Sequence, residues 1–165
     1  MGKSTVVAVV ALILVTAFGV GYYVLPSNKT GQTEQNTPKI TTSSKSLDLS
    51  GQKLTALSTT ITNQTDVTSL NLSNNQLETL PANIGNMVNL EVLNVENNRL
   101  KTLPADIGKL TKLVTADFSN NRMVSLPLEL AKLTQLKSLN LNGYKGPQSD
   151  IDQLKTQLPN TQIKM

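Results

Sequence analysis

The carboxyl-terminal part of the sequence repeats itself every 23 residues, and this constrains the fold more than any other feature. The stretch SLNLSNNQLETLP at residues 69–81 returns as VLNVENNRLKTLP at 92–104 and as TADFSNNRMVSLP at 115–127. Its apolar positions and its asparagine pair keep the same spacing each time. Self-similarity at such a period is typical of a solenoid, in which each repeat buries its apolar side against the next.

Each repeat contains a short alternation of apolar and polar residues, which is typical of a half-buried strand. One strand per repeat, always re-entering in the same direction, predicts a parallel sheet with neighbouring strands about 4.8 Å apart. Five coils would then stack to about 20 to 25 Å. The predicted strand cores are Leu47-Asp48-Leu49, Leu70-Asn71-Leu72, Leu93-Asn94-Val95, Ala116-Asp117-Phe118 and Leu139-Asn140-Leu141.

An asparagine follows each central strand, at Asn75, Asn98 and Asn121. The chain turns inward there and leaves backbone groups without partners in the sheet. A buried amide both donates and accepts hydrogen bonds, so these three side chains are predicted to form a structural ladder between coils. We interpret Asn71 and Asn74 as exposed neighbours of this ladder.

A Leu-Pro pair after each ladder residue predicts the bend onto the return path, because proline needs no donor there. The segments ANIGNMVNL, ADIGKLTKL and LELAKLTQL then place apolar residues three or four apart. That spacing predicts a single helical or 3-10 turn on the side opposite the sheet. These apolar residues are Ile84, Met87, Leu90, Ile107, Leu110, Leu113, Leu130, Leu133 and Leu136.

The pattern LxxLxLxxNxLxxLPxxIGxL, seen in LNLSNNQLETLPANIGNMVNL and LNVENNRLKTLPADIGKLTKL, resembles that of the 23-residue leucine-rich repeat proteins. The resemblance implies an α/β solenoid: a right-handed coil with a concave parallel β-sheet and short helical, 3-10 or irregular convex segments. It also implies that the concave face binds other macromolecules, mostly proteins. The family name alone does not choose the partner.

The ends of the repeat region depart from the pattern, as terminal coils do. The first coil has Gln52 at the ladder position and no Leu-Pro turn, and the last has Tyr144 there. Residues 146–165 are predicted to cap the open end with a helix over 150–158, which starts at Ser149 or Asp150 as N-cap, and an edge strand over 162–165. The predicted repeat domain is 45–165, with about five repeats.

The amino-terminal part is predicted to have three segments. Residues 1–5 are a short basic flank, and residues Val6 to Leu25 are an uncharged, mostly apolar run of spanning length. Residues 26–44 are rich in polar residues and are expected to be a flexible linker. We expect 6–25 to be a transmembrane helix acting as a signal-anchor; the alternative is a signal peptide cleaved near 15–17.

Either interpretation places the repeat domain outside the cytoplasm, as a single-pass membrane protein or, after cleavage, as a secreted one. The net charge of +4 is concentrated near the amino terminus, because residues 46–165 hold eleven Lys and Arg against ten Asp and Glu. We therefore expect no nucleic-acid partner. The absence of Cys and His from the sequence excludes thiol nucleophiles, imidazole acid/base catalysis and Cys/His zinc sites. No catalytic, metal or cofactor site is predicted.

Strand residues that point away from the core form the predicted binding surface, which is polar and slightly acidic. We expect it to bind a protein or peptide; the alternative is a surface adhesin or scaffold that binds glycan or cell-wall polymer. Arg99, Arg122 and Tyr144 are candidates for larger contacts. The predicted partner-binding residues on the concave face are Asn71, Ser73, Asn94, Glu96, Asp117, Ser119 and Asn140.

Overall fold

The structure is a computed structural model that describes residues 12–16, 19–23 and 45–165. Contacts divide the chain into two units, Met1–Ile40 and Thr41–Met165. In the first unit, β1 (Leu12–Thr16) and β2 (Gly19–Tyr23) form an antiparallel pair, in which Leu12 faces Tyr23 and Thr16 faces Gly19.

These two strands lie where the sequence predicts a transmembrane helix over 6–25. Leu12–Thr16 contains β-branched residues and Gly19–Tyr23 contains two glycines. β-Branched residues favour strands, and glycine costs an interior helical position about 1 kcal/mol. In the described parts of the chain, every helix is too short or too polar to cross a bilayer. The predicted basic flank, the linker and the rest of 6–25 lie outside the described residues.

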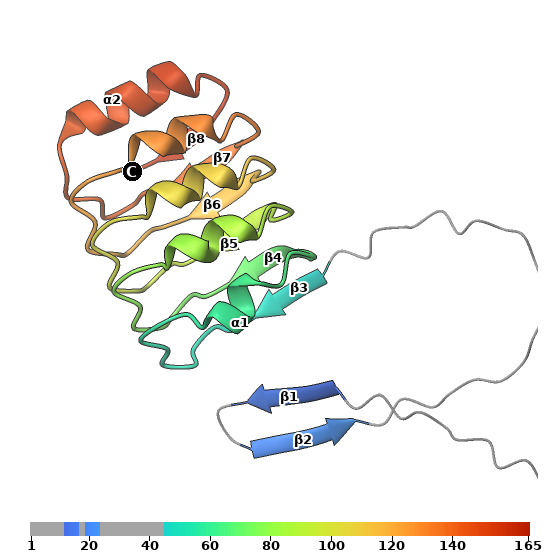
Figure 1. The fold of residues 1–165 in the computed structure, drawn as a ribbon. Coiled ribbons are helices and arrows are strands. Elements are labelled where there is room, and N and C mark those ends of the chain that lie inside the picture. The colour runs from blue at the N-terminus through green and yellow to red at the C-terminus, as the bar shows by residue number, and fades with distance from the viewer. Residues whose placement is uncertain (1–11, 17–18, 24–44) are drawn as a thin grey trace, which may run out of the picture. The chain divides into compact units, whose positions relative to one another are not determined.

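The second unit is built on a six-stranded parallel sheet, in which the strands are neighbours in chain order. Figure 1 shows the strands stacked one above another, with the helical turns along the opposite side. Facing residues are 23 positions apart through most of the sheet, as in the series Leu70, Leu93, Ala116 and Leu139. The strands are β3 (Lys45–Asp48), β4 (Val67–Asn71), β5 (Val92–Asn94), β6 (Thr115–Asp117), β7 (Ser138–Asn140) and β8 (Gln162–Lys164).

The core lies between this sheet and the helical turns. Strand residues Leu70, Leu93 and Leu139 are fully buried, as the alternation predicts. All nine apolar residues predicted to line the return path are buried as well. The aliphatic repeat thus closes one continuous hydrophobic core, in which each coil covers its neighbour.

Three 3-10 helices form the return path: η1 (Ala82–Asn86), η2 (Ala105–Lys109) and η3 (Leu128–Lys132). Each is preceded by the proline of a Leu-Pro pair. The Pro81 carbonyl accepts from the Ile84 N–H at 3.0 Å, which closes the turn without a donor from the proline.

Glycine in the middle of η2 allows the coils to approach closely. A Cβ added at Gly108 would lie 2.7 Å from the carbonyl oxygen of Glu129 in the next coil. Gly85 in η1 meets Asp106 in the same way. The glycine of the repeat therefore sets the spacing between neighbouring helical turns.

The two ends of the solenoid are closed differently. In the first coil, α1 (Thr59–Thr62) replaces the Leu-Pro turn, and the Ser58 hydroxyl accepts from the Thr60 N–H. At the other end lie α2 (Gln148–Gln157) and β8, which pairs with β7 in parallel. The predicted cap helix and edge strand are present, but the N-cap is Pro147 rather than Ser149 or Asp150, because the helix begins earlier than predicted.

Candidate interaction surface

The three predicted ladder residues join neighbouring coils. The side-chain carbonyl of Asn98 accepts from the Leu77 N–H of the preceding coil at 3.0 Å. Its amide donates to the carbonyls of Leu72, one coil back, at 2.9 Å and of Val95, in its own coil, at 3.0 Å. Asn98 is 7% exposed, so each of these bonds satisfies a backbone group that water does not reach freely.

Asn75 and Asn121 repeat this arrangement one coil before and one coil after. Asn121 accepts from the Leu100 N–H at 2.9 Å and donates to the Val95 carbonyl at 3.0 Å. Asn75 accepts from the Leu54 N–H at 2.9 Å. The ladder is therefore continuous from the first coil to the fourth.

A second column of side chains, at the ends of the strands, is also used within the fold. The Asn94 side-chain oxygen accepts from the Glu96 N–H at 2.9 Å, and Asn71 accepts from the Ser73 N–H at 3.1 Å. This bond to the N–H two residues ahead is an Asx turn, which ends the strand. The same turn is made by Asp48, Asp117 and Asn140.

Most predicted partner-binding residues belong to these turns. Asn71, Asn94, Asp117 and Asn140 are half-buried, as is Glu96. Asp117 additionally accepts from the Asn140 amide at 2.8 Å across the sheet. Ser73 and Ser119 are 5% and 3% exposed and offer little surface to a partner. Four of the seven carry hydrogen bonds that the turns require.

A third asparagine in each coil, just before the ladder residue, has a backbone role. Asn74, Asn97 and Asn120 have φ of 58°, 55° and 53°. Among residues with a side chain, asparagine adopts this left-handed conformation most readily. The interpretation of Asn71 and Asn74 as mere exposed neighbours therefore misses two structural roles.

The row at the start of the strands is left available for contact. Ser69, Val92, Thr115 and Ser138 face one another in register. Val92 is 39% exposed, and its three neighbours are half-buried. We call these four residues the Val92 row. An apolar residue at an outward-facing strand position was the sequence signal for this row, and the predicted site list omits it.

The first strand of the parallel sheet, β3, ends at Asp48. The pKa of the Asp48 carboxyl lies below its usual value, chiefly because the carboxylate accepts from the Ser50 backbone N–H. Within residues 45–165 and the two described strands of the amino-terminal unit, acidic side chains form no cluster of three that could hold a metal ion.

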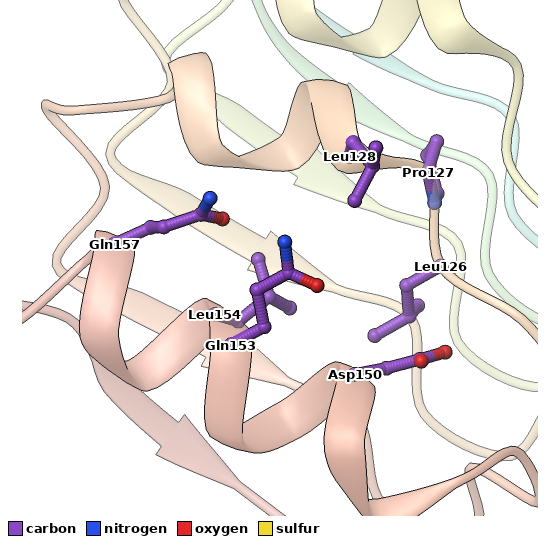
Figure 2. Close-up of a pocket in the computed structure, with 7 residues that line it drawn as sticks. All are labelled: Leu126, Pro127, Leu128, Asp150, Gln153, Leu154 and Gln157. Atoms are coloured by element: carbon purple, nitrogen blue, oxygen red, sulfur yellow. The ribbon is translucent and has the colours of Figure 1, made fainter.

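A small cavity lies between η3 and the cap helix α2 (Figure 2). Its volume is about 30 Å³, which is room for one water molecule rather than for a ligand. The side chains that line it come from the start of η3 and from one face of α2: Leu126, Pro127, Leu128, Asp150, Gln153, Leu154 and Gln157.

Tyr144 is used by the carboxyl-terminal cap. Its hydroxyl donates to the Asp150 carboxylate in α2, and the residue is half-buried. Burial, followed by this bond to Asp150, raises the pKa of the Tyr144 phenol. Of the three candidates for larger contacts, only Arg99 and Arg122 are exposed.

The geometry agrees with the comparisons to known proteins. Residues 45–159 match the model of the leucine-rich repeat region family, and the chain belongs to this family. Among solved structures, it is similar to a leucine-rich repeat protein of Leptospira interrogans, with 33% identity and a TM-score of 0.66. That match covers 68% of this chain and 29% of the Leptospira chain. The chain has no match among the curated proteins. Domains of this family are typically non-enzymatic scaffolds for protein interaction.

Proposed function

We propose that the repeat domain is a non-catalytic interaction module that binds a protein or peptide partner on its concave face. The observation that carries this proposal is the Val92 row. Its side chains make no hydrogen bond within the described residues 45–165, whereas the Asx residues beside it are bonded internally. A partner therefore meets an exposed valine flanked by small hydroxyl side chains.

A peptide fits this row better than a compact ligand does. The row runs across four neighbouring strands, so at about 4.8 Å per strand it is about 15 Å long. The small cavity of the described residues lies elsewhere, between η3 and α2, and none of the four residues lines it. Protein segments contact extended open surfaces, whereas small molecules occupy enclosed sites.

The test replaces Val92 and Thr115 together by arginine, which places two large charges in the row. The matched control replaces Val88 and Thr111 by arginine. These two residues are exposed, lie outside the sheet and are 23 residues apart, as Val92 and Thr115 are. Partners would be captured by crosslinking to the full chain and compared among the three proteins. We expect a partner that the wild type and the control pair retain and the Val92→Arg/Thr115→Arg pair loses.

If the Val92→Arg/Thr115→Arg protein retains every partner, the binding site does not lie on the concave face. Captured glycan or wall polymer, in place of protein, would favour the adhesin alternative. Asn94 and Asp117 are unsuitable for this test, because their replacement would also remove Asx turns.

Membrane tethering with the repeat domain outside the cytoplasm is a further part of the proposal. It is supported by the uncharged run Val6 to Leu25 behind Lys3 and by the polar segment 26–44. Deletion of 6–25 should retain the chain in the cytoplasm, as measured by cell fractionation and protease protection. Export of the deleted chain would contradict this part alone.

A further inference from the structure

The only two arginines of the sequence occupy the same position in neighbouring coils. Arg99 and Arg122 each follow a ladder asparagine directly, and Lys145 continues the series one coil further. Their backbone N–H groups make the same bond to the preceding coil, at 2.9, 2.9 and 3.0 Å. All three residues are exposed. We call them the arginine stripe; their backbone positions lie about one strand spacing, about 4.8 Å, apart.

The stripe carries uncompensated positive charge. Within residues 45–165, none of its members makes an ion pair. The acidic residue beside it is Glu78, which accepts from the Lys101 ammonium at 3.1 Å. The pKa of Glu78 is lowered by Lys101 first and by Arg122 and Arg99 after it. One carboxylate, already paired with a lysine, thus faces both guanidinium groups.

A column of lysines on the helical side of the solenoid differs from the arginine stripe in its charge balance. Lys109, at the end of η2, forms an ion pair with Asp106 one turn before it. The two other lysines of the column also have an acidic residue three positions earlier in the same helix. This column is therefore locally balanced. The acidic and basic residues at this spacing are Asp106 and Lys109, Glu129 and Lys132, and Asp152 and Lys155; within 45–165, the first two form an ion pair.

An exposed apolar side chain adjoins the arginine stripe. Val124 is 58% exposed, and the residue between it and Arg122 is the buried Met123. Because side chains alternate along an extended segment, Val124 and Arg122 point to the same side. The surface therefore offers guanidinium groups and an apolar contact together.

We propose that the arginine stripe, with Val124, is a second interaction surface that binds an acidic peptide segment of a protein partner. Guanidinium groups bind carboxylates through two parallel hydrogen bonds, and arginine is enriched among the residues that dominate binding energy. Val124 favours a ligand with apolar side chains between its carboxylates. A phosphate polymer or a lipid headgroup layer would leave Val124 without a partner.

The test measures binding of a labelled peptide of glutamates with interspersed leucines to the full-length chain at low salt. The Arg99→Glu/Arg122→Glu variant should bind it more weakly by about tenfold or more. The matched control, Lys109→Glu/Lys132→Glu, changes the net charge equally at the same 23-residue separation and should bind within about twofold of the wild type. Arg99→Gln/Arg122→Gln should show an intermediate loss. The glutamine variant is the fallback if the glutamate variant unfolds. Glutamine fits the fold at the arginine position, because Gln76 occupies that position in the coil before Arg99.

Three outcomes would overturn the proposal. The first is no binding of the peptide to the wild type, and the second is equal loss in the stripe and control variants, which would show a response to net charge only. The third is tighter, arginine-dependent binding of inorganic polyphosphate or phosphatidylserine vesicles than of the peptide. A separate measurement tests Val124 alone. Salt screens charge attraction, so a peptide of glutamates without leucines should lose its binding at high salt. If that peptide still binds at high salt, Val124 has no role in binding.

Discussion

The Tyr144 hydroxyl donates to the Asp150 carboxylate, and this bond ties the last repeat coil to the first turn of the cap helix. Gly146 lies beneath it: a Cβ there would clash with the Tyr144 hydroxyl and the Val124 carbonyl. The carboxyl-terminal end of the core is therefore covered by a helix that a specific polar contact holds in place.

Tyr144→Phe should destabilise the fold, because it leaves a half-buried carboxylate without this donor. A hydrogen bond to a charged group contributes about 1.5 to 3 kcal/mol, and we expect a loss toward the lower end of that range. Urea unfolding measures it. Asp152→Asn, an exposed change in the same helix, is the control and should leave the midpoint nearly unchanged. Equal midpoints for Tyr144→Phe and the wild type would show that the bond does not hold the cap.

The same contact predicts a loss of stability in alkali. The folded state raises the pKa of the Tyr144 phenol above its unfolded value of about 10. The folded state thus favours the protonated phenol, so the contribution is complete below about pH 10 and is lost as the pH rises through and above that value. Unfolding free energies from pH 8 to 11 should fall more steeply for the wild type than for Tyr144→Phe. Parallel curves would contradict the assignment.

Asn97 should tolerate glycine but not valine, because its φ of 55° lies in the left-handed region. Glycine adopts this conformation without steric cost, whereas a residue with a branched Cβ loses about 1 to 2 kcal/mol there. Thermal unfolding of Asn97→Gly and Asn97→Val measures the difference. Asn86, exposed in η1, provides the control: its replacement by valine should cost clearly less than the same change at Asn97.

Gly108→Ala should be destabilising, since the new methyl group would lie 2.7 Å from the Glu129 carbonyl oxygen. Overpacking of this kind costs about 1 to 3 kcal/mol. Lys109→Ala, at the adjacent exposed position, removes only a surface ion pair and should cost less than about 1 kcal/mol. A stabilised Gly108→Ala protein would show that the coils are not closely packed at this glycine.

The period of the sequence predicted the sheet, its parallel order, the buried leucines and the turns that follow each Leu-Pro pair. It did so because burial at Leu70 or Ile84 depends only on which side of an element a residue faces. The roles of Asn71 and Asn74 were missed, since alternation gives a side chain's direction and not its hydrogen bonds. Alternation placed the Val92 row beside the predicted binding columns, but it could not show that the Asx residues in those columns are hydrogen-bonded within the fold and that the side chains of the row are not.

The amino-terminal run shows where pattern alone fails. A continuous apolar stretch without period fits a helix and a strand equally well, and the helix was chosen for 6–25 on its length. Leu12–Thr16 and Gly19–Tyr23 are strands, in keeping with their β-branched residues; their glycines disfavour a helix. The start of α2 was placed too late because a side-chain N-cap was sought, and Pro147 supplies none.

Asn98→Ala should destabilise the repeat. It leaves the Leu77 N–H without its partner in a region shielded from water, whereas the Leu72 carbonyl still accepts from the Asn75 amide. A buried group left unsatisfied costs about 1 to 3 kcal/mol, and we expect a loss of that size. Asn86→Ala is the exposed control for the unfolding experiment and should be nearly neutral.

The central claim is that the ladder asparagines join neighbouring coils and so hold the sheet and its concave face in place. Amide hydrogen exchange, followed residue by residue, tests it most directly. The Leu77 N–H should be protected in the wild type and exchange faster in Asn98→Ala, whereas the Leu100 N–H, which bonds to Asn121, should stay protected. Unprotected Leu77 in the wild type, or equal protection of Leu77 in both proteins, would contradict the claim.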